Sequence, residues 1–508
     1  MLRQQGQIPA SYHRAVSIQY TFDPLVNEYL RRTIGIDAAN RLYREEAPAA
    51  FWTARYFRDL QKEEYFIVLL PDGALHSVHH TIAEAAPGAN LTEEQAQARA
   101  EEFLREAKKI DLSRWKLVEA QSNKLPARTD HNFIWEEAQP LNPAPPGAET
   151  AHVRISLVVQ GDELSGYRIF VHLPEDWVRR QNATTLANTL QTVLFVSLVG
   201  GLGLAMLIIF LRSLKTSLPA AVPWRGIALW ALVVLAASLV RFATLVPQYM
   251  LTYRTDQPFA TFIGTLLIGQ TLAASLFYSG TIFLLGLAVF FLAQGYGFDR
   301  VPLARILPSV YYRDAILIML CGWAVLAGFR RLRDLVAALW PVAHYGFPAS
   351  VPEGLDAIWP ALSSLATAII FCILAAAVIA LVLGFATGYL RRASIQWLVL
   401  AALAIFSVPR WGSAGDFVQT ALLTFLELAV IWWGVSRLAR LNLLGYLLLA
   451  MLLSLTPAID GLLTQPNAYF RSNGVILIAA AAILIVLPLI LWRSAARRES
   501  LSSKFAPV

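Results

Sequence analysis

The sequence predicts a polytopic α-helical membrane protein of about nine transmembrane helices, with an N-terminal α+β soluble domain. Of its 508 residues, 56% are hydrophobic and only 15% are charged, whereas an ordinary soluble domain carries about 25% charged residues. Apolar runs of about 20 residues, long enough to span a bilayer, recur after residue 186. Before that point the apolar residues repeat with the periods of strands and amphipathic helices.

The composition divides the chain into residues 1–185 and 186–508. The second part holds 21 Lys or Arg and 10 Asp or Glu, so its net charge is +11 and that of the first part is −4. The basic excess therefore belongs to the loops of the hydrophobic part, where Lys and Arg retain loops on the cytoplasmic side of a membrane. The expected partner is the lipid bilayer, and a nucleic-acid-binding surface is excluded.

The first 185 residues contain signals for both helices and strands. Residues 21–65 are predicted to be mainly helical. Residues 65–70 are β-rich and end at the turn sequence Pro-Asp-Gly of 71–73, after which 74–80 would be the returning strand. This part of the chain is expected to form its own core, since about 185 residues with such apolar periodicity bury enough surface.

A capped helix and a second hairpin complete the predicted soluble domain. The sequence Thr-Glu-Glu-Gln at 92–95 is a capping box, because the Thr hydroxyl and the Gln amide satisfy free backbone N–H groups of the first turn. Apolar residues alternate along 153–159 and again along 167–173, with a turn at 160–163. One face of this hairpin is apolar, so we expect it to pack against the capped helix.

The hydrophobic part contains nine candidate transmembrane helices. They are expected at 187–211, 226–247, 259–295, 314–329, 359–390, 394–408, 417–435, 441–458 and 474–492. The third is long for a hydrocarbon layer of about 30 Å, so it would tilt, protrude or break near 278–280, and the fourth is short enough to be re-entrant.

Loop charges predict how these helices are oriented. If residues 1–185 face outward, the inner loops carry 14 Lys or Arg and the outer loops carry 6. The bias predicts an extracytoplasmic N-terminal domain and a cytoplasmic C-terminus in a bacterial inner (plasma) membrane. A cluster of Arg330, Arg331 and Arg333 on the outer side opposes it. Residues 1–20 lack the apolar segment of a secretory signal, so we expect an export signal or helix upstream of this start.

Three ionisable residues in or near the predicted helices are candidate functional groups. Glu427 lies mid-helix, where a carboxylate must face the bundle, pair or stay protonated. It is a candidate proton or ion site, substrate contact or acid–base, the alternative being a neutral hydrogen-bonded helix contact. Arg241 is its natural charge partner, unless it extends to the outer interface. Asp460 follows Pro457 at a helix end and is expected at the interface.

No metal or other cofactor is predicted. Seven of the eight histidines precede residue 173, and the eighth, His344, lies in a predicted loop. The His-Glu-x-x-His motif that binds zinc on a helix is absent from the sequence. His76, His79 and His80 cluster at a strand end, where His76 and His80 would share one strand face. That arrangement offers two metal ligands and no evident third.

Six short motifs in residues 20–180 carry a family resemblance. They are FRDLQKEEY at 57–65, PDG at 71–73, LTEEQA at 91–96, RTDHNFIWE at 128–136, GDELSGY at 161–167 and VHLPEDW at 171–177. This region resembles the extracytoplasmic part of bacterial multi-pass proteins classed with the CPBP (CAAX-type) intramembrane proteases. Its helix-then-hairpin part is also similar to a PepSY-type module, a small extracytoplasmic fold often regarded as regulatory.

The catalytic signature of those proteases is absent. The resemblance would require Glu-Glu-x-x-x-Arg on one membrane helix and Phe-x-x-x-His on another, and neither occurs after residue 186. No catalytic residue is carried over, so we predict a non-catalytic relative whose N-terminal domain senses or binds a protein or peptide partner. The first alternative is a permease that uses Glu427 as a coupling carboxylate. The second is an intramembrane protease with an unrecognised site.

Overall fold

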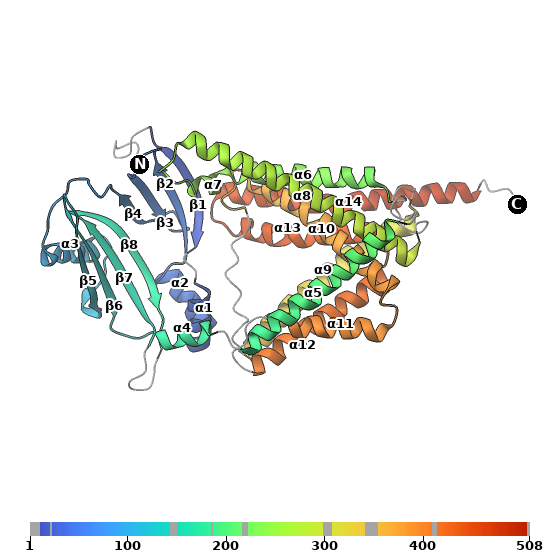
Figure 1. Ribbon diagram of the computed structural model, residues 1–508, viewed down its shortest axis with the longest axis horizontal. Helices are drawn as coiled ribbons and strands as arrows, with labels where there is room; N and C mark the ends of the chain where they lie inside the picture. Colours follow the sequence, from blue (N-terminus) through green and yellow to red (C-terminus); the bar gives the residue numbers. More distant parts are fainter. Residues whose placement is uncertain are drawn as a thin grey trace. The chain divides into compact units, whose positions relative to one another are not determined.

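Two antiparallel β-sheets and a series of long apolar helices make up the chain, as the computed structural model shows (Figure 1). The structure describes residues 11–20, 23–142, 150–183, 186–215, 222–297, 307–340, 354–408 and 414–504. His344, and three of the loop arginines that count toward the predicted orientation (Arg300, Arg305 and Arg410), lie outside these ranges.

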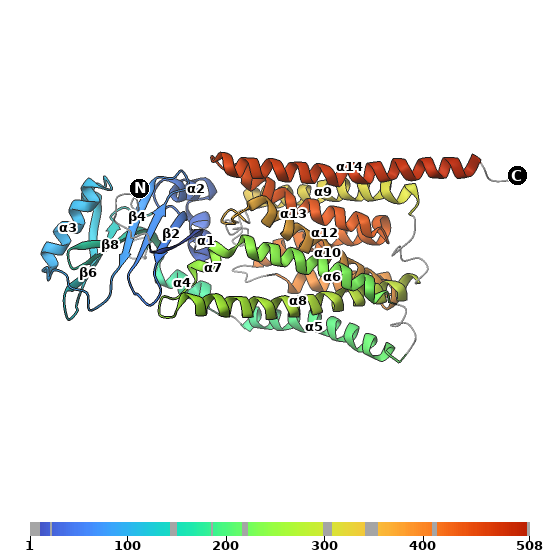
Figure 2. The same cartoon turned by 90° about the horizontal axis from the view of Figure 1, so that it is seen from above.

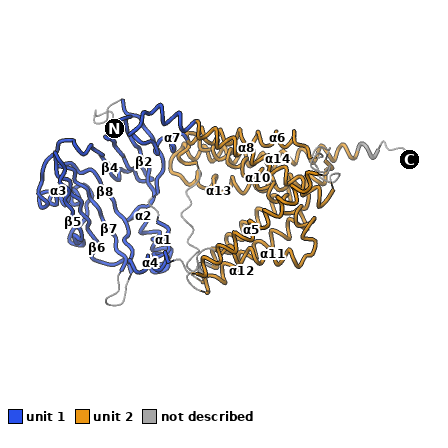
Figure 3. Tube along the Cα trace, viewed as in Figure 1, with its two compact units in different colours: residues 1–183, 246–267, 345–350 blue, residues 184–245, 268–344, 351–508 orange. Residues whose placement is uncertain are grey.

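The chain divides into two compact units (Figure 3). The first, called the β-sheet unit below, comprises Met1–Ala183, Val246–Leu267 and Tyr345–Ser350. The second, the helical unit, comprises Thr184–Leu245, Ile268–His344 and Val351–Val508. The β-sheet unit therefore includes a segment that lies between two of the long apolar helices in the sequence.

Eight strands form the two sheets of the β-sheet unit, each an antiparallel meander of four. The first sheet contains β1 (His13–Tyr20), β2 (Ala50–Phe57), β3 (Glu64–Leu69) and β4 (Leu75–Thr81) in that order. The second contains β5 (Trp115–Lys124), β6 (Thr129–Glu137), β7 (His152–Gln160) and β8 (Glu163–His172). Strand β4 of the first sheet lies beside β8 of the second (Figures 1 and 2).

The prediction that residues 21–65 are mainly helical was only partly right. Two helices form there, α1 (Pro24–Thr33) and α2 (Ile36–Glu45). Residues 50–57, however, form strand β2, in which every second side chain is buried. Alternation with a period of two places these side chains on one face of a sheet, and pairing with β1 and β3 stabilises that conformation.

Both predicted hairpins and the capping box are confirmed. Strands β3 and β4 are joined through Gly73, and β7 and β8 through Gly161; these glycines have φ of 90° and 63°, which favours glycine for lack of a Cβ. Helix α3 (Glu93–Glu106) begins with both hydrogen bonds of a capping box, between Thr92 and Gln95.

The first four helices of the β-sheet unit cover the second sheet. Ala96, Ala100 and Leu104 of α3 are fully buried against apolar residues of β6, β7 and β8, as the hairpin pattern predicted. Helices α1 and α2 form a second core with β7, β8 and α4 (Glu175–Asn182). The apolar face of the second sheet is thus buried by helices, as an amphipathic sheet requires.

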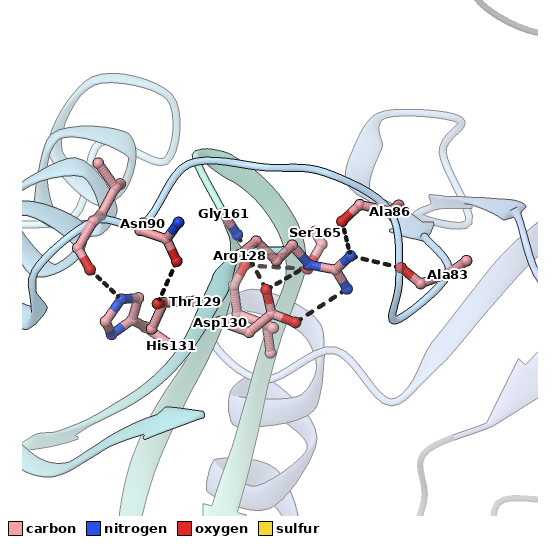
Figure 4. A network of polar contacts seen from close by, with 11 residues as sticks. Ala83, Ala86, Asn90, Arg128, Thr129, Asp130, His131, Gly161 and Ser165 are labelled. Atoms are coloured by element: carbon pink, nitrogen blue, oxygen red, sulfur yellow. Dashed lines mark hydrogen bonds and ion pairs between the residues drawn. The ribbon is translucent and has the colours of Figure 1, made fainter. Parts of the chain in front are cut away.

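Arg128 organises the loops at one end of the second sheet (Figure 4). Its side chain is 1% exposed and forms an ion pair with Asp130, with an Nε–Oδ1 distance of 2.8 Å. The guanidinium also donates to the carbonyls of Ala83 and Ala86, at 2.6 and 3.0 Å. Asp130 in turn accepts a hydrogen bond from the backbone N–H of Gly161. One buried charge therefore ties the loop before α3 to the β7–β8 turn.

We expect Arg128→Met to destabilise the β-sheet unit by about 3–5 kcal/mol, because it removes a buried cation and leaves the partly buried Asp130 carboxylate, which is 15% exposed, without its partner. Pulse proteolysis of the full chain in detergent across a urea series measures the change in free energy of unfolding. Arg99→Met is the matched control, since the Arg99–Asp162 ion pair is exposed; it should change stability by about 0.5 kcal/mol or less. Equal effects of the two variants would contradict this role of Arg128.

The helical unit supports the predicted multi-pass architecture. Its elements are α5 (Leu186–Ser213), α6 (Trp224–Thr244), α8 (Phe259–Tyr296), α9 (Ser309–Leu339), α10 (Pro360–Gly388), α11 (Ala393–Phe406), α12 (Ala414–Trp433), the π-helix η4 (Gly434–Ala439), α13 (Leu443–Leu463) and α14 (Ala468–Lys504). Among the described residues, eight helices are long and apolar enough to cross a membrane, and α11 is a shorter apolar helix. The helix expected at 314–329 is longer than predicted.

Small residues bring two of the central helices into close contact. Gly384 of α10 lies against the backbone of Phe291 and Leu292 of α8, so that a Cβ at this position would overlap it. One turn further, Gly295 of α8 lies against Thr387 of α10. In a lipid environment such contacts replace the hydrophobic effect as the force that holds helices together.

Candidate functional site

The intramembrane candidate Glu427 is paired with an arginine. Glu427 lies on α12, and its carboxylate accepts a hydrogen bond from the guanidinium of Arg333 on α9. The side chains are 27% and 25% exposed, so the pair is partly accessible from outside the chain. The buried Nε of Arg333 has no acceptor among the described residues. The Arg333 guanidinium thus supplies the counter-charge that a carboxylate within a membrane requires.

The other two predicted candidates do not join this pair. Arg241 of α6 donates from Nε to the hydroxyl of Thr367 on α10, at 3.1 Å, so the expectation that it neutralises Glu427 was wrong. Asp460 is exposed near the end of α13. Among the described residues, neither Arg241 nor Asp460 is hydrogen-bonded to Glu427. The three candidates therefore do not form one site.

A buried ion pair in the β-sheet unit holds the segment that follows α6. Arg55 of β2 is 6% exposed and forms two hydrogen bonds with the carboxylate of Glu64 on β3, at 2.7 and 2.8 Å. Its Nη1 donates to the backbone carbonyls of Leu251 and Tyr253, at 2.9 and 2.6 Å. Thr255 donates to the same Glu64 carboxylate. We call this group of contacts the Arg55 clamp.

Aromatic packing surrounds the Arg55 clamp. Phe57 and Tyr253 are buried with their ring centroids 5.0 Å apart, and Tyr253 contacts Phe259 at the start of α8 edge-to-face. The His13 ring of β1 stacks on Phe259 at 4.3 Å. Burial raises the pKa of Tyr253 above its usual value. The connection between α6 and α8, which includes the short helix α7 (Val246–Leu251), is thus held to the first sheet by both charge and apolar contact.

A cavity of about 380 Å³ opens beside β4, next to β8; we call it the seam cavity. Three kinds of side chain line it: aromatic and aliphatic groups, hydroxyl and amide groups, and basic groups. They are Phe51, Phe66, Val68, Tyr167 and Ile169; Gln19, Thr53, Ser77 and Thr81; and His76, His79 and Arg168. Burial lowers the pKa of His76 to about 4, with the nearby Lys108 and His79 contributing, and burial also lowers the pKa of His79.

The seam cavity and the Arg55 clamp share one face of the first sheet. The strand registers place Arg55, Phe66 and His79 directly opposite one another on β2, β3 and β4. Phe66 lies between the other two: it lines the cavity, and its ring centroid is 5.7 Å from the Arg55 guanidinium carbon. The two features are therefore adjacent in one cross-strand row, where side chains contact each other directly.

The histidine cluster is divided between the two faces of β4. The expectation that His76 and His80 share a face was wrong, because the register with β3 shifts between Val68 and Leu69 and displaces His76 toward the cavity. The His80 ring instead lies between two carboxylates, with Nδ1 2.7 Å from Glu163 and Nε2 3.1 Å from Glu63. Among the described residues, no group of three His, Cys, Asp or Glu side chains could hold a metal ion.

Sequence reasoning missed Arg55, the residue with the most informative contacts. A charged residue within a strand is usually exposed, so Arg55 gave no signal by its type alone. Its position could have given one, because Phe51, Thr53, Arg55 and Phe57 alternate along β2 and share the buried face. An arginine on the apolar face of a strand predicts a buried partner.

Comparisons with known proteins give no assignment: no family model, no curated protein and no solved structure matches this chain.

We expect the β-sheet unit to lose stability as the pH falls from 6.5 to about 4. The unfolded chain protonates His76 near the ordinary value of 6.5, whereas the folded chain does so only near 4, so protons favour unfolding within that window. Above pH 6.5 this contribution to stability is fully present. Pulse proteolysis of the full chain at a series of pH values measures the effect, and His76→Gln should reduce its slope. An unchanged slope in that variant would show that His76 does not carry the effect.

Proposed function

We propose that this multi-pass membrane protein is a transducer, in which the β-sheet unit receives a ligand or partner and acts on the membrane helices through the connection between α6 and α8. The Arg55 clamp carries the proposal. A buried guanidinium directs its N–H groups to one carboxylate on the sheet and to two carbonyls of that connection. Charge-assisted hydrogen bonds of this kind contribute about 1.5–3 kcal/mol each.

The chain path supports transmission through this connection. Helix α7 follows α6 within two residues, and α8 begins at Phe259, a few residues after the clamped carbonyl of Tyr253. Helix α8 starts in the β-sheet unit and continues through the helical unit to Tyr296. A displacement of β2 would therefore act on a continuous helix, because a helix resists bending and transmits motion along its axis.

The proposed setting is a bacterial inner membrane, with the β-sheet unit outside and the C-terminus inside. The distribution of Lys and Arg supports it. The three arginines that oppose it lie within α9 rather than in a loop, and two of them form ion pairs, Arg333 with Glu427 and Arg331 with Asp334. The motifs in residues 20–180 support a non-catalytic relative of CPBP-type proteins with a PepSY-like module.

Removing the Arg55 clamp should release the α6–α8 connection without unfolding the sheet. The double variant Arg55→Met/Glu64→Met replaces the ion pair by apolar side chains of similar length, so no buried charge is left unpaired. In the full chain in lipid nanodiscs, we expect amide hydrogen exchange across 246–258 to accelerate by about tenfold or more, since several charge-assisted bonds are lost. Hydrogen exchange with mass spectrometry gives the rates segment by segment.

The matched control for this experiment is Arg14→Met. Arg14 is exposed and lies on the opposite face of the first sheet, so its replacement should leave exchange across 246–258 unchanged. Exchange in β6 and β7 should be the same in all three proteins. If the double variant showed no acceleration in 246–258 or at the start of α8, the Arg55 clamp would not couple the two units and the proposed route would be wrong.

A permease that uses Glu427 is the second candidate function, and the Arg333–Glu427 pair favours it. The pair joins α9 and α12, and Arg333 keeps one buried N–H group without an acceptor among the described residues. A substrate anion or a proton acting on this pair would shift the balance of charge between two helices.

Glu427→Gln separates the two functions. If the protein is a permease coupled through Glu427, the variant should lose proton flux in proteoliposomes under an imposed pH gradient, although it inserts at normal yield. An entrapped pH-sensitive dye measures the flux. A transducer should show no such flux in either protein and keep its slow hydrogen exchange across 246–258. The variant Arg333→Met/Glu427→Met controls for damage caused by an unpaired arginine.

A further inference from the structure

The lining of the seam cavity is selective in its charge. Among the described residues that line it, none carries a carboxylate, and they include Arg168, His76 and His79. The cation Lys108 lies beside it, donating to the backbone carbonyl of His76 and lying 4.5 Å from the centroid of the Tyr167 ring. Because burial lowers the pKa of His76 and of His79, these two rings are neutral near pH 7. The positive charge at the cavity therefore comes from Arg168 and Lys108, and it attracts an anion and disfavours a cation.

Tyr167, Arg168 and Ile169 of β8 all line the cavity, so it meets both faces of this strand, and Arg168 lines it from the face opposite to the other two. Gly166 lies two residues before it and therefore shares its face of the strand. A Cβ at Gly166 would lie 3.4 Å from Nδ1 of His79, a cavity residue. Arg168 is exposed, and its guanidinium carbon lies 5.0 Å from the centroid of the partly exposed Phe170 ring, so only this contact has to yield when the side chain moves toward an incoming anion.

The remaining lining suits an apolar body with few polar groups. Phe51, Phe66 and Tyr167 present aromatic rings, and the hydroxyl-bearing side chains Thr53 and Ser77 are 3% and 5% exposed. The volume of about 380 Å³ falls within the range of about 300–1,000 Å³ that small-molecule sites occupy. Such sites combine apolar walls with a few placed polar groups that fix orientation.

We propose that the seam cavity binds a small organic acid, a molecule with one carboxylate and one aromatic or aliphatic body. The carboxylate pairs with the guanidinium of Arg168, and the body occupies the space between Phe51, Phe66 and Tyr167. The proposal rests on the proposed function, because it names the ligand that the β-sheet unit receives. It also gives that ligand a path to the membrane helices, since Phe66 contacts both the cavity and Arg55.

The probe for this site is 4-fluorophenylacetate, observed by ¹⁹F NMR with the full chain in detergent. We expect saturable broadening of its resonance, and binding about tenfold weaker for the neutral 4-fluorophenylacetamide, which cannot form the ion pair. Arg168→Gln should weaken binding of the acid by about tenfold and leave binding of the amide unchanged. Ser77→Leu, which fills the cavity from β4, should abolish binding of both.

Arg14→Gln is the matched control, because it removes the same charge from the opposite face of the first sheet. Binding that is equal for acid and amide, or equal in the Arg168→Gln and Arg14→Gln proteins, would overturn the proposal. So would the absence of saturable binding by the wild-type chain to 4-fluorophenylacetate and to its aliphatic counterpart, 6-fluorohexanoate.

Hydrogen exchange across 246–258 separates this proposal from the proposed function. Slower or faster exchange in the presence of saturating 4-fluorophenylacetate would support both. Specific binding, lost in Arg168→Gln, with unchanged exchange in 246–258 would uphold the seam cavity as an organic-acid site and count against transmission through the Arg55 clamp. Accelerated exchange in Arg55→Met/Glu64→Met, together with no binding of 4-fluorophenylacetate by the wild-type chain, would uphold transmission through the Arg55 clamp and count against the organic-acid site.

Discussion

The Arg55 guanidinium is a buried charge, and a protein tolerates such a charge only when it is paired and its N–H groups are hydrogen-bonded. Here one carboxylate and two backbone carbonyls meet that requirement, and the carbonyls belong to a segment almost 200 residues further along the chain. The first sheet and the α6–α8 connection thus depend on each other. Releasing the connection would leave the buried Arg55 guanidinium without two of its acceptors. Separating the connection from the first sheet therefore carries an electrostatic cost.

The same face of the first sheet also carries the proposed ligand site, the seam cavity, next to the Arg55 clamp. Because side chains on neighbouring strands align in rows, Arg55, Phe66 and His79 follow one another across β2, β3 and β4. The seam cavity exists because β4 and β8 belong to separate sheets, so that side chains rather than a backbone ladder bridge them. A gap of this kind can accept a ligand without breaking backbone hydrogen bonds. A bound ligand would contact Phe66, which in turn contacts Arg55.

The helical unit obeys a different constraint, because lipid offers neither water nor counter-ions to an exposed charge. The pairing of Glu427 with Arg333 satisfies it, whereas Arg241 receives one neutral acceptor, the hydroxyl of Thr367. Close packing at glycine, as at Gly384 of α10, supplies the cohesion that hydrophobic burial provides in the β-sheet unit. The ion pair accounts structurally for Glu427 and Arg333, whether or not Glu427 also takes part in transport.

The sequence by itself determined the local features: the apolar helices, the two hairpins with Gly73 and Gly161 at their turns, and the capping box at Thr92, because each depends on residues close together in the chain. Strand β2 escaped prediction, since its aromatic residues also suit a helix and only pairing with β1 and β3 decides between them. Tertiary structure alone decided that Glu427 pairs with Arg333 rather than with Arg241. It also decided that His76 and His80 lie on different faces of β4, and that Arg55 donates hydrogen bonds to the carbonyls of Leu251 and Tyr253. Those contacts join distant segments, and no local pattern specifies which segments become neighbours.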